Sequence, residues 1–193
     1  MIDPVKITNF KRTREELEEL LIFCILVAGK TASIQAKKLE LFLRKDKYNS
    51  SPFSLISEYI DKGILLSKIQ ESKLGQYNRL QKAFTQILEL DVFKCTVQQL
   101  EAITGIGPKT ARFFLLHSRA NQKLAVLDTH LLKWLRSEIG LDTPKATPTA
   151  KKYLILEQAF LKYCEDNNKS PATLDLEIWN KYSSIKNKQK NIQ

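Results

Sequence analysis

The apolar residues of this chain recur with the period of an amphipathic α-helix along most of its length. Residues 13–28 differ, because the second half of this segment is apolar on every side and is expected to be buried all round. Thr13 can cap this helix at its start, and Gly29 marks its end. Similar patterns predict helices at residues 31–45, 53–61, 64–72, 77–89, 129–140, 151–167 and 172–184.

The expected fold class is all-α. No strand longer than a few residues is indicated, and long stretches run without any of the 6 Gly and 6 Pro. Residues 47–54 have the composition of a loop, and the polar, basic tail after residue 184 is expected to fray. In the helix at 31–45, the residues expected on one apolar side are Ile34, Ala36, Leu39, Leu41 and Leu43.

The charge of the chain points to an anionic partner. Lys and Arg number 31 against 21 Asp and Glu, which gives a formal net charge of +10. Nucleic acid is the first candidate and an anionic membrane the second, although a basic protein without such a partner is an open alternative. The apolar run at residues 20–29 is too short to span a bilayer, and the acidic residues before it do not suit an export signal. We therefore expect no membrane association.

The cysteines and histidines argue against a metal or iron–sulfur site. Cys24, Cys95 and Cys164 lie about 70 residues apart, so no two have the spacing of metal ligands. With only His117 and His130 beside them, we expect no metal and no cofactor. An odd number of cysteines without a disulfide framework favours a reduced, intracellular protein of the cytoplasm or nucleoid.

Residues 96–117 predict two helices joined by a tight turn. Thr96 opens the first helix with Gln99 in capping-box position, the turn contains Gly105 and Gly107, and Pro108 begins the second helix. The first N–H groups of that second helix lack helical partners and lie at the positive end of its dipole. The turn is therefore predicted to bind a DNA backbone phosphate through Gly105, Ile106, Gly107 and Thr110, with an ordinary helix corner as the alternative.

Lys109 and Asp128 are the candidate catalytic residues. A lysine in the first turn of a helix meets the positive end of the dipole, and burial would lower its pKa further, which favours a nucleophilic amine. Beside bound DNA, Lys109 is positioned to attack C1′ of a deoxyribose and form a Schiff base. Asp128 can act as a base or stabilise positive charge on the sugar, or it can simply cap the next helix. A surface or phosphate-binding lysine is the alternative for Lys109.

The segment "ITGIGPKTA", followed by "VLDTH" with its aspartate 19 residues after the lysine, resembles the helix-hairpin-helix/Gly-Pro-Asp superfamily of base-excision DNA glycosylases. The segments "KKYLILEQAF" and "LDLEIWNKY" are similar to a compact 8-oxoguanine DNA glycosylase/AP lyase group of archaea and some bacteria. This resemblance implies that Lys109 forms the Schiff base and that Asp128 assists. It also implies two lobes beside a DNA groove, one formed by residues 1–32 with 122–193 and the other by residues 33–121.

The resemblance suggests further contacts with DNA. Lys30 follows Gly29 in the loop where the family fills the gap left by a flipped base, so Lys30 is the candidate gap-filling residue. Trp179 can stack on the extruded base or belong to the core beside Leu174 and Ile178. Asp175 can accept a hydrogen bond from a purine edge or be a surface charge, and Trp134 is expected in the core.

These expectations combine into a base-excision repair enzyme. We expect a monomer that binds double-stranded DNA containing a damaged base and removes an oxidised purine, 8-oxoguanine, through a lysine Schiff base. The alternatives are a non-catalytic DNA-binding module, a glycosylase for another damaged base, and a glycosylase without lyase activity in which Asp128 activates water.

Overall fold

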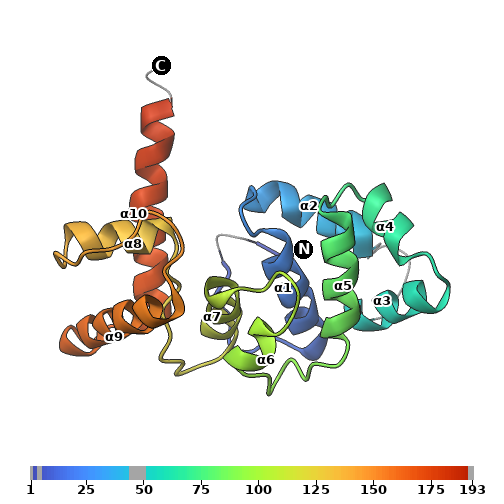
Figure 1. The fold of residues 1–193 in the computed structure, drawn as a ribbon, viewed down its shortest axis with the longest axis horizontal. Coiled ribbons are helices and arrows are strands. Elements are labelled where there is room, and N and C mark those ends of the chain that lie inside the picture. Colours follow the sequence, from blue (N-terminus) through green and yellow to red (C-terminus); the bar gives the residue numbers. More distant parts are fainter. Residues whose placement is uncertain (1, 4–5, 44–50, 191–193) are drawn as a thin grey trace. The chain divides into compact units, whose positions relative to one another are not determined.

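The computed structural model describes residues 2–3, 6–43 and 51–190, and side chains as far as Tyr182. In these residues it contains ten helices and no strand, which confirms the predicted all-α class. The helices are drawn in Figure 1. Their bounds are α1 Arg14–Leu26, α2 Ala32–Leu43, α3 Pro52–Asp61, α4 Leu65–Glu71, α5 Tyr77–Ile87, α6 Val97–Glu101, α7 Pro108–Ser118, α8 Thr129–Ser137, α9 Ala150–Asp166 and α10 Pro171–Lys190.

The chain forms two compact units, Met1–Phe114 and Leu115–Gln193. Helix α7 begins in the first unit, and its last turn belongs to the second. The predicted grouping of residues 1–32 with 122–193 stays a prediction. None of the helices in the described part of the chain is long and apolar enough to cross a membrane.

Helix α1 is the central helix of the first unit. Its residues from Leu17 to Leu26 are all buried, as predicted from a segment that is apolar on every side, and α2 and α3 both pack on it. Thr13 caps it in a capping box, because the Thr13 hydroxyl accepts from the N–H of Glu16 and the Glu16 carboxylate accepts from that of Thr13. Gly29 follows the helix with φ +71°. Helices α3, α4 and α5 pack on one another beside this core.

The predicted apolar side of α2 is partly wrong. Ile34 and Leu41 are 52% and 67% exposed, whereas Ala36, Leu39 and Leu43 are buried. The buried stripe instead continues through Gln35 and Phe42, at the spacing of three and four residues that a single helix face requires.

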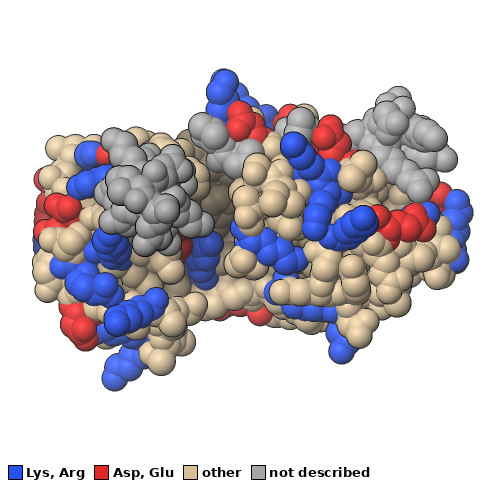
Figure 2. All heavy atoms as spheres, turned by 90° about the horizontal axis from the view of Figure 1, so that it is seen from above, with Lys and Arg blue, Asp and Glu red and all other residues tan. Residues whose placement is uncertain are grey.

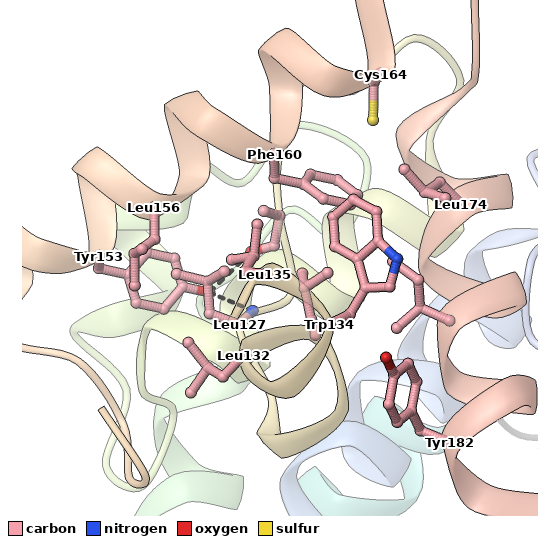
Figure 3. Packing of buried hydrophobic residues seen from close by; sticks show 13 residues of the cluster. Leu127, Leu132, Trp134, Leu135, Tyr153, Leu156, Phe160, Cys164, Leu174 and Tyr182 are labelled. Carbon is pink, nitrogen blue, oxygen red and sulfur yellow. Dashed lines mark hydrogen bonds between the residues drawn. The ribbon is translucent and has the colours of Figure 1, made fainter. Parts of the chain in front are cut away.

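The second unit has its own hydrophobic core between α8, α9 and α10 (Figure 3). Trp134 is 5% exposed, and its ring meets those of Phe160 and Tyr163 edge-on at centroid distances of 6.3 and 4.9 Å. The prediction that Trp134 is a core residue is confirmed. Helix α10 runs to Lys190, so the helix continues beyond residue 184, where fraying was predicted.

Candidate active site and DNA interface

The two helices of the hairpin are joined as the sequence predicts. Thr96 caps α6 in a capping box with Gln99, whose side chain accepts from the Thr96 N–H at 2.9 Å. Across the hairpin, Arg112 Nη1 lies 2.8 Å from Glu101 Oε1, and it also donates to the carbonyl of Pro108 at 3.3 Å. This buried guanidinium ties α6 to the first turn of α7, so the two helices hold a fixed angle around the turn.

The turn itself is held by side chains from α5. Gln86 accepts a hydrogen bond from the N–H of Thr104 at 2.8 Å, and Arg79 Nη1 donates to the carbonyl of Gly105 at 3.4 Å. Gly105 has φ +84°, a value that favours glycine. Ile106 is 4% exposed and therefore anchors the turn in the core. These contacts fix a glycine-rich turn whose outer side, at Gly105 and Gly107, is exposed.

The first turn of α7 leaves backbone N–H groups for a ligand. The N–H of Ala111 is the first to donate within the helix, to the carbonyl of Gly107 at 3.0 Å. Those of Lys109 and Thr110 precede it and have no carbonyl four residues back within the helix. Pro108 carries no N–H group at all. The predicted phosphate-binding turn therefore has the backbone geometry of an anion site, since these groups lie at the positive end of the dipole.

Lys109 is half-buried in the second position of α7. It is close enough to Cys24 of α1 for its positive charge to lower the pKa of that thiol. Burial has the larger and opposite effect and raises the pKa of Cys24 to about 12. The Cys24 thiol is therefore protonated at neutral pH, and the neighbour of Lys109 in α1 is an uncharged group.

Asp128 is the N-cap of α8. Its Oδ1 accepts the N–H groups of His130 and Leu131, both at 2.8 Å, which confirms the predicted capping role and fixes the carboxylate. The carboxylate is half-buried rather than enclosed in the core. Because capping occupies Oδ1 with two donors, the position of the second oxygen is set by the same contacts.

Two buried polar residues of α9 hold the segment before Asp128, and sequence reasoning missed them. The Tyr153 hydroxyl donates to the carbonyl of Ala125 at 2.8 Å and accepts from the N–H of Leu127 at 3.2 Å (Figure 3). Glu157 Oε1 accepts from the N–H of Ala125 at 2.9 Å. The sequence did contain a signal for them, because Tyr153 and Glu157 share a face of α9 with the apolar Leu156 and Phe160. Polar side chains on an apolar face indicate buried hydrogen bonds.

The two candidate base-recognition residues lie on α10. Trp179 is 40% exposed, so its interpretation as a core residue is wrong. Its ring meets that of His130 edge-on at 6.5 Å, which places Trp179 beside the N-terminus of α8, where Asp128 is the cap. Asp175 is 8% exposed, so its interpretation as a surface charge is also wrong, and its Oδ2 lies 3.1 Å from His117 Nε2. Whether either residue contacts a base stays a prediction.

Lys30 is half-buried after α1, and its Nζ donates to the carbonyl of Leu74 at 2.8 Å. Burial lowers its pKa, and the nearby charges of Arg79 and Lys38 lower it further. Lys38 donates in the same way to the carbonyl of Lys73. Two lysines therefore bond to the loop at residues 73–74, and the gap-filling role of Lys30 stays a prediction.

The charges on the surface agree with an anionic partner. On the face drawn in Figure 2, Lys and Arg cover more of the surface than Asp and Glu. No group of three or more His, Cys, Asp and Glu side chains among the described residues is arranged to hold a metal ion.

Fold and site together define a helix-hairpin-helix protein with a lysine in the first turn of the second hairpin helix. The 8-oxoguanine DNA glycosylase family model matches residues 2–169, and the chain belongs to this family. The predicted resemblance is thus confirmed.

Proteins named 8-oxoguanine DNA glycosylase/AP lyase are similar to this chain. That of Thermoplasma acidophilum is 27% identical over 180 residues, covering 88% of this chain and 81% of its own length. That of Fusobacterium nucleatum is 28% identical over 183 residues, covering 90% and 82%.

Solved structures share the fold. The 8-oxoguanine DNA glycosylase of Methanocaldococcus jannaschii matches with a TM-score of 0.65 at 24% identity, over 93% of this chain and 84% of that one. A second structure of that enzyme, with a TM-score of 0.65, is a complex with a 15mer DNA containing 8-oxoguanine. The enzyme of Thermotoga maritima matches with a TM-score of 0.62 at 24% identity, over 88% and 80% of the two chains.

Proposed function

We propose that this protein is a DNA glycosylase with AP lyase activity that removes 8-oxoguanine from double-stranded DNA through a Schiff base on Lys109. Membership in the 8-oxoguanine DNA glycosylase family and the names of the similar proteins support the activity. The observation that carries the residue assignment is the position of Lys109 in the first turn of α7, beside a hairpin turn with unpaired N–H groups.

The hairpin binds the DNA backbone and presents the sugar to the lysine. A phosphate accepts hydrogen bonds from the N–H groups at Gly107, Lys109 and Thr110, while the exposed glycines let the backbone approach closely. These contacts are independent of sequence, as a repair enzyme that inspects all DNA requires. The damaged nucleotide is rotated out of the duplex before the reaction.

Lys109 supplies the nucleophile. The free electron pair on its Nζ forms a bond to C1′ while the bond from C1′ to N9 breaks, and the base leaves with the electron pair of the broken bond and takes up a proton. The nitrogen then gives up a proton, and the bond from C1′ to O4′ breaks as O4′ takes up a proton, so the sugar ring opens and a protonated imine joins Nζ to C1′. Loss of a proton from C2′ then expels the 3′ phosphate and cuts the strand, and water releases the lysine.

Asp128 stabilises the positive charge that develops on the sugar as the base departs. A carboxylate whose Oδ1 is held by two N–H groups does not need to reorganise during the reaction. Trp179 stacks on the extruded purine, Asp175 accepts from its N–H edge, and Lys30 fills the gap that the base leaves in the duplex. The protein acts as a monomer inside the cell.

Borohydride trapping tests the assignment of the lysine. The wild-type protein incubated with a duplex that contains 8-oxoguanine, in the presence of borohydride, should give a covalent complex on a denaturing gel. Lys109→Gln should bind the same duplex and give no complex, whereas Lys94→Gln, at an exposed lysine of the same unit, should trap normally.

The same experiment separates the alternatives. Excision of the base without any trapped complex would support a glycosylase in which Asp128 activates water. Undiminished trapping by Lys109→Gln would assign the Schiff base to another lysine. A duplex panel with one lesion each tests the substrate, because faster cleavage at a pyrimidine lesion would contradict the choice of 8-oxoguanine.

A further inference from the structure

A buried pair of polar side chains joins α7 to α10. His117 lies in the last turn of α7 and is fully buried, with an exposed fraction of 0%. Its Nε2 lies 3.1 Å from Oδ2 of Asp175, which is 8% exposed in the second turn of α10. The helix that contains Lys109 in its first turn is therefore hydrogen-bonded, through its last turn, to the helix that contains Trp179.

Hydrophobic packing does not account for this pair. Leu115 and Leu116, which precede His117, are both buried, and an apolar residue at position 117 would fit the same core. A buried imidazole and carboxylate each lose their hydration, and such pairs add little stability compared with apolar residues of the same volume. A directed hydrogen bond does provide one fixed position for the Asp175 carboxylate.

Asp175 and Trp179 are four residues apart and so lie on the same side of α10. The adjacent side of this helix, with Leu174, Ile178 and Tyr182, belongs to the core of the second unit. Trp179 remains 40% exposed beside His130. A rotation of α10 by a few degrees around that core would move the carboxylate and the indole ring together.

We infer that His117 is a positioning residue for recognition of the oxidised purine. Its bond to Asp175 fixes both the carboxylate and the rotation of α10 that presents Trp179 to the extruded base. This inference rests on the proposed function. It deepens that function by giving a part in base selection to His117, a fully buried residue in the last turn of α7.

The consequence is a separation of the two activities. Excision of 8-oxoguanine requires the base to be held, whereas strand cleavage at a preformed abasic site has no base to hold. Loss of the pair should therefore slow excision selectively and leave the reaction of Lys109 with an abasic site intact.

Two amide substitutions form a matched pair. The amide nitrogen of glutamine falls close to the position of imidazole Nε2, whereas that of asparagine falls close to the position of Nδ1. His117→Gln should therefore keep the bond to Asp175 and stay within about threefold of wild-type excision. His117→Asn should lose the bond and slow single-turnover excision by ~10–100-fold, by analogy with the loss of hydrogen-bond partners that orient metal ligands.

Borohydride trapping and cleavage on abasic duplexes are measured for the same variants. Both should stay within about threefold of wild type for His117→Asn. Leu116→Ala, a cavity variant of the neighbouring buried residue, serves as a control for destabilisation and should not separate the two activities. Equal loss of both activities in His117→Asn, or no loss of either, would overturn the inference.

Failure of the proposed function gives a different result from failure of this inference. A wild-type protein that neither traps on abasic DNA nor excises 8-oxoguanine would refute the function itself. If His117→Asn does not fold, His117→Leu replaces it, because leucine fills the buried site and removes the bond to Asp175 without altering Asp175 itself. Excision must again fall at least tenfold more than cleavage of abasic DNA for the inference to stand.

Discussion

Arg79 donates from Nη1 to the carbonyl of Gly105 at 3.4 Å, and a Cβ atom on Gly105 would lie only 2.8 Å from the same nitrogen. Nη2 of this guanidinium also donates to the carbonyl of Ile25 near the end of α1. The hairpin turn is therefore held to the core of the first unit through one side chain of α5. Burial lowers the pKa of Arg79, although its ordinary value is so high that the guanidinium remains charged.

Gly105→Ala should destabilise the protein by about 1–2 kcal/mol, because alanine is strained at φ +84° and its methyl group displaces Arg79. Thermal unfolding measures this loss. Gly107→Ala is the matched variant, since its Cβ meets nothing within 4 Å and its φ is not positive, so its melting temperature should fall less. Both variants should bind DNA more weakly, because Gly105→Ala distorts the turn that Arg79 holds and Gly107→Ala adds a methyl group on the exposed side of the turn. Unchanged DNA affinity in both would contradict the phosphate site.

Lys30→Ala should weaken binding to a duplex with an abasic-site analogue more than binding to an intact duplex. A residue that fills the gap acts only where a nucleotide has left the stack. Lys38→Ala is the control, since Lys38 also donates to a carbonyl of the loop at residues 73–74 and carries the same charge. Both affinities are measured at one fixed salt concentration. An equal loss on both duplexes would indicate that Lys30 is a general electrostatic contact.

Cys24 should react slowly with iodoacetamide at pH 8.5 in the folded protein and rapidly in urea. Its thiol is fully buried with a pKa of about 12, and only the thiolate is nucleophilic. The folded state holds this proton between pH 9 and 12 while the unfolded thiol releases it. The free energy of unfolding should therefore decrease as the pH rises through that range. Cys24→Ala should reduce this pH dependence, and a dependence identical to wild type would contradict the burial of the thiol.

The sequence predicted the features of this fold that depend on neighbouring residues. Thr13 and Thr96 both cap helices with the partner three residues away, and Asp128 caps α8. Such contacts are formed within one turn, so spacing alone determines them. The glycine turn follows in the same way from a short pattern.

Features that depend on packing between distant helices were not predictable. Leu174, Ile178 and Tyr182 already form the buried stripe of α10, and Trp179 lies just outside it, so hydrophobicity alone did not separate core from surface at this position. The burial of Asp175 depends on His117, which is 58 residues away. No local pattern identifies such a partner.

Tyr153→Phe should slow the chemical step and lower stability, because it removes the hydroxyl that bonds to both Ala125 and Leu127. The buried carbonyl and N–H groups left unpaired should cost about 1–3 kcal/mol of unfolding free energy. Excision should slow because this backbone leads directly to Asp128. Tyr163→Phe, a half-buried tyrosine of the same helix, serves as the control. Lower stability with an unchanged single-turnover rate would indicate that the segment has no role in positioning Asp128.

Asp128→Asn separates the capping role from the chemical role of this residue. Asparagine caps a helix about as well as aspartate, since its side-chain oxygen accepts the same N–H groups, so the melting temperature should change little. The amide cannot stabilise positive charge on the sugar, and single-turnover excision should slow by ~10²-fold or more at unchanged DNA affinity.

Asp128→Ala completes the comparison because it removes both functions. Loss of the cap should lower its unfolding free energy by ~1 kcal/mol and lower its melting temperature accordingly. Its single-turnover excision rate should match that of Asp128→Asn. Thermal unfolding, DNA binding and single-turnover excision are measured on the same preparations of the three proteins. A normal rate in Asp128→Asn, with a loss in Asp128→Ala that follows stability alone, would show that Asp128 acts only as the cap of α8.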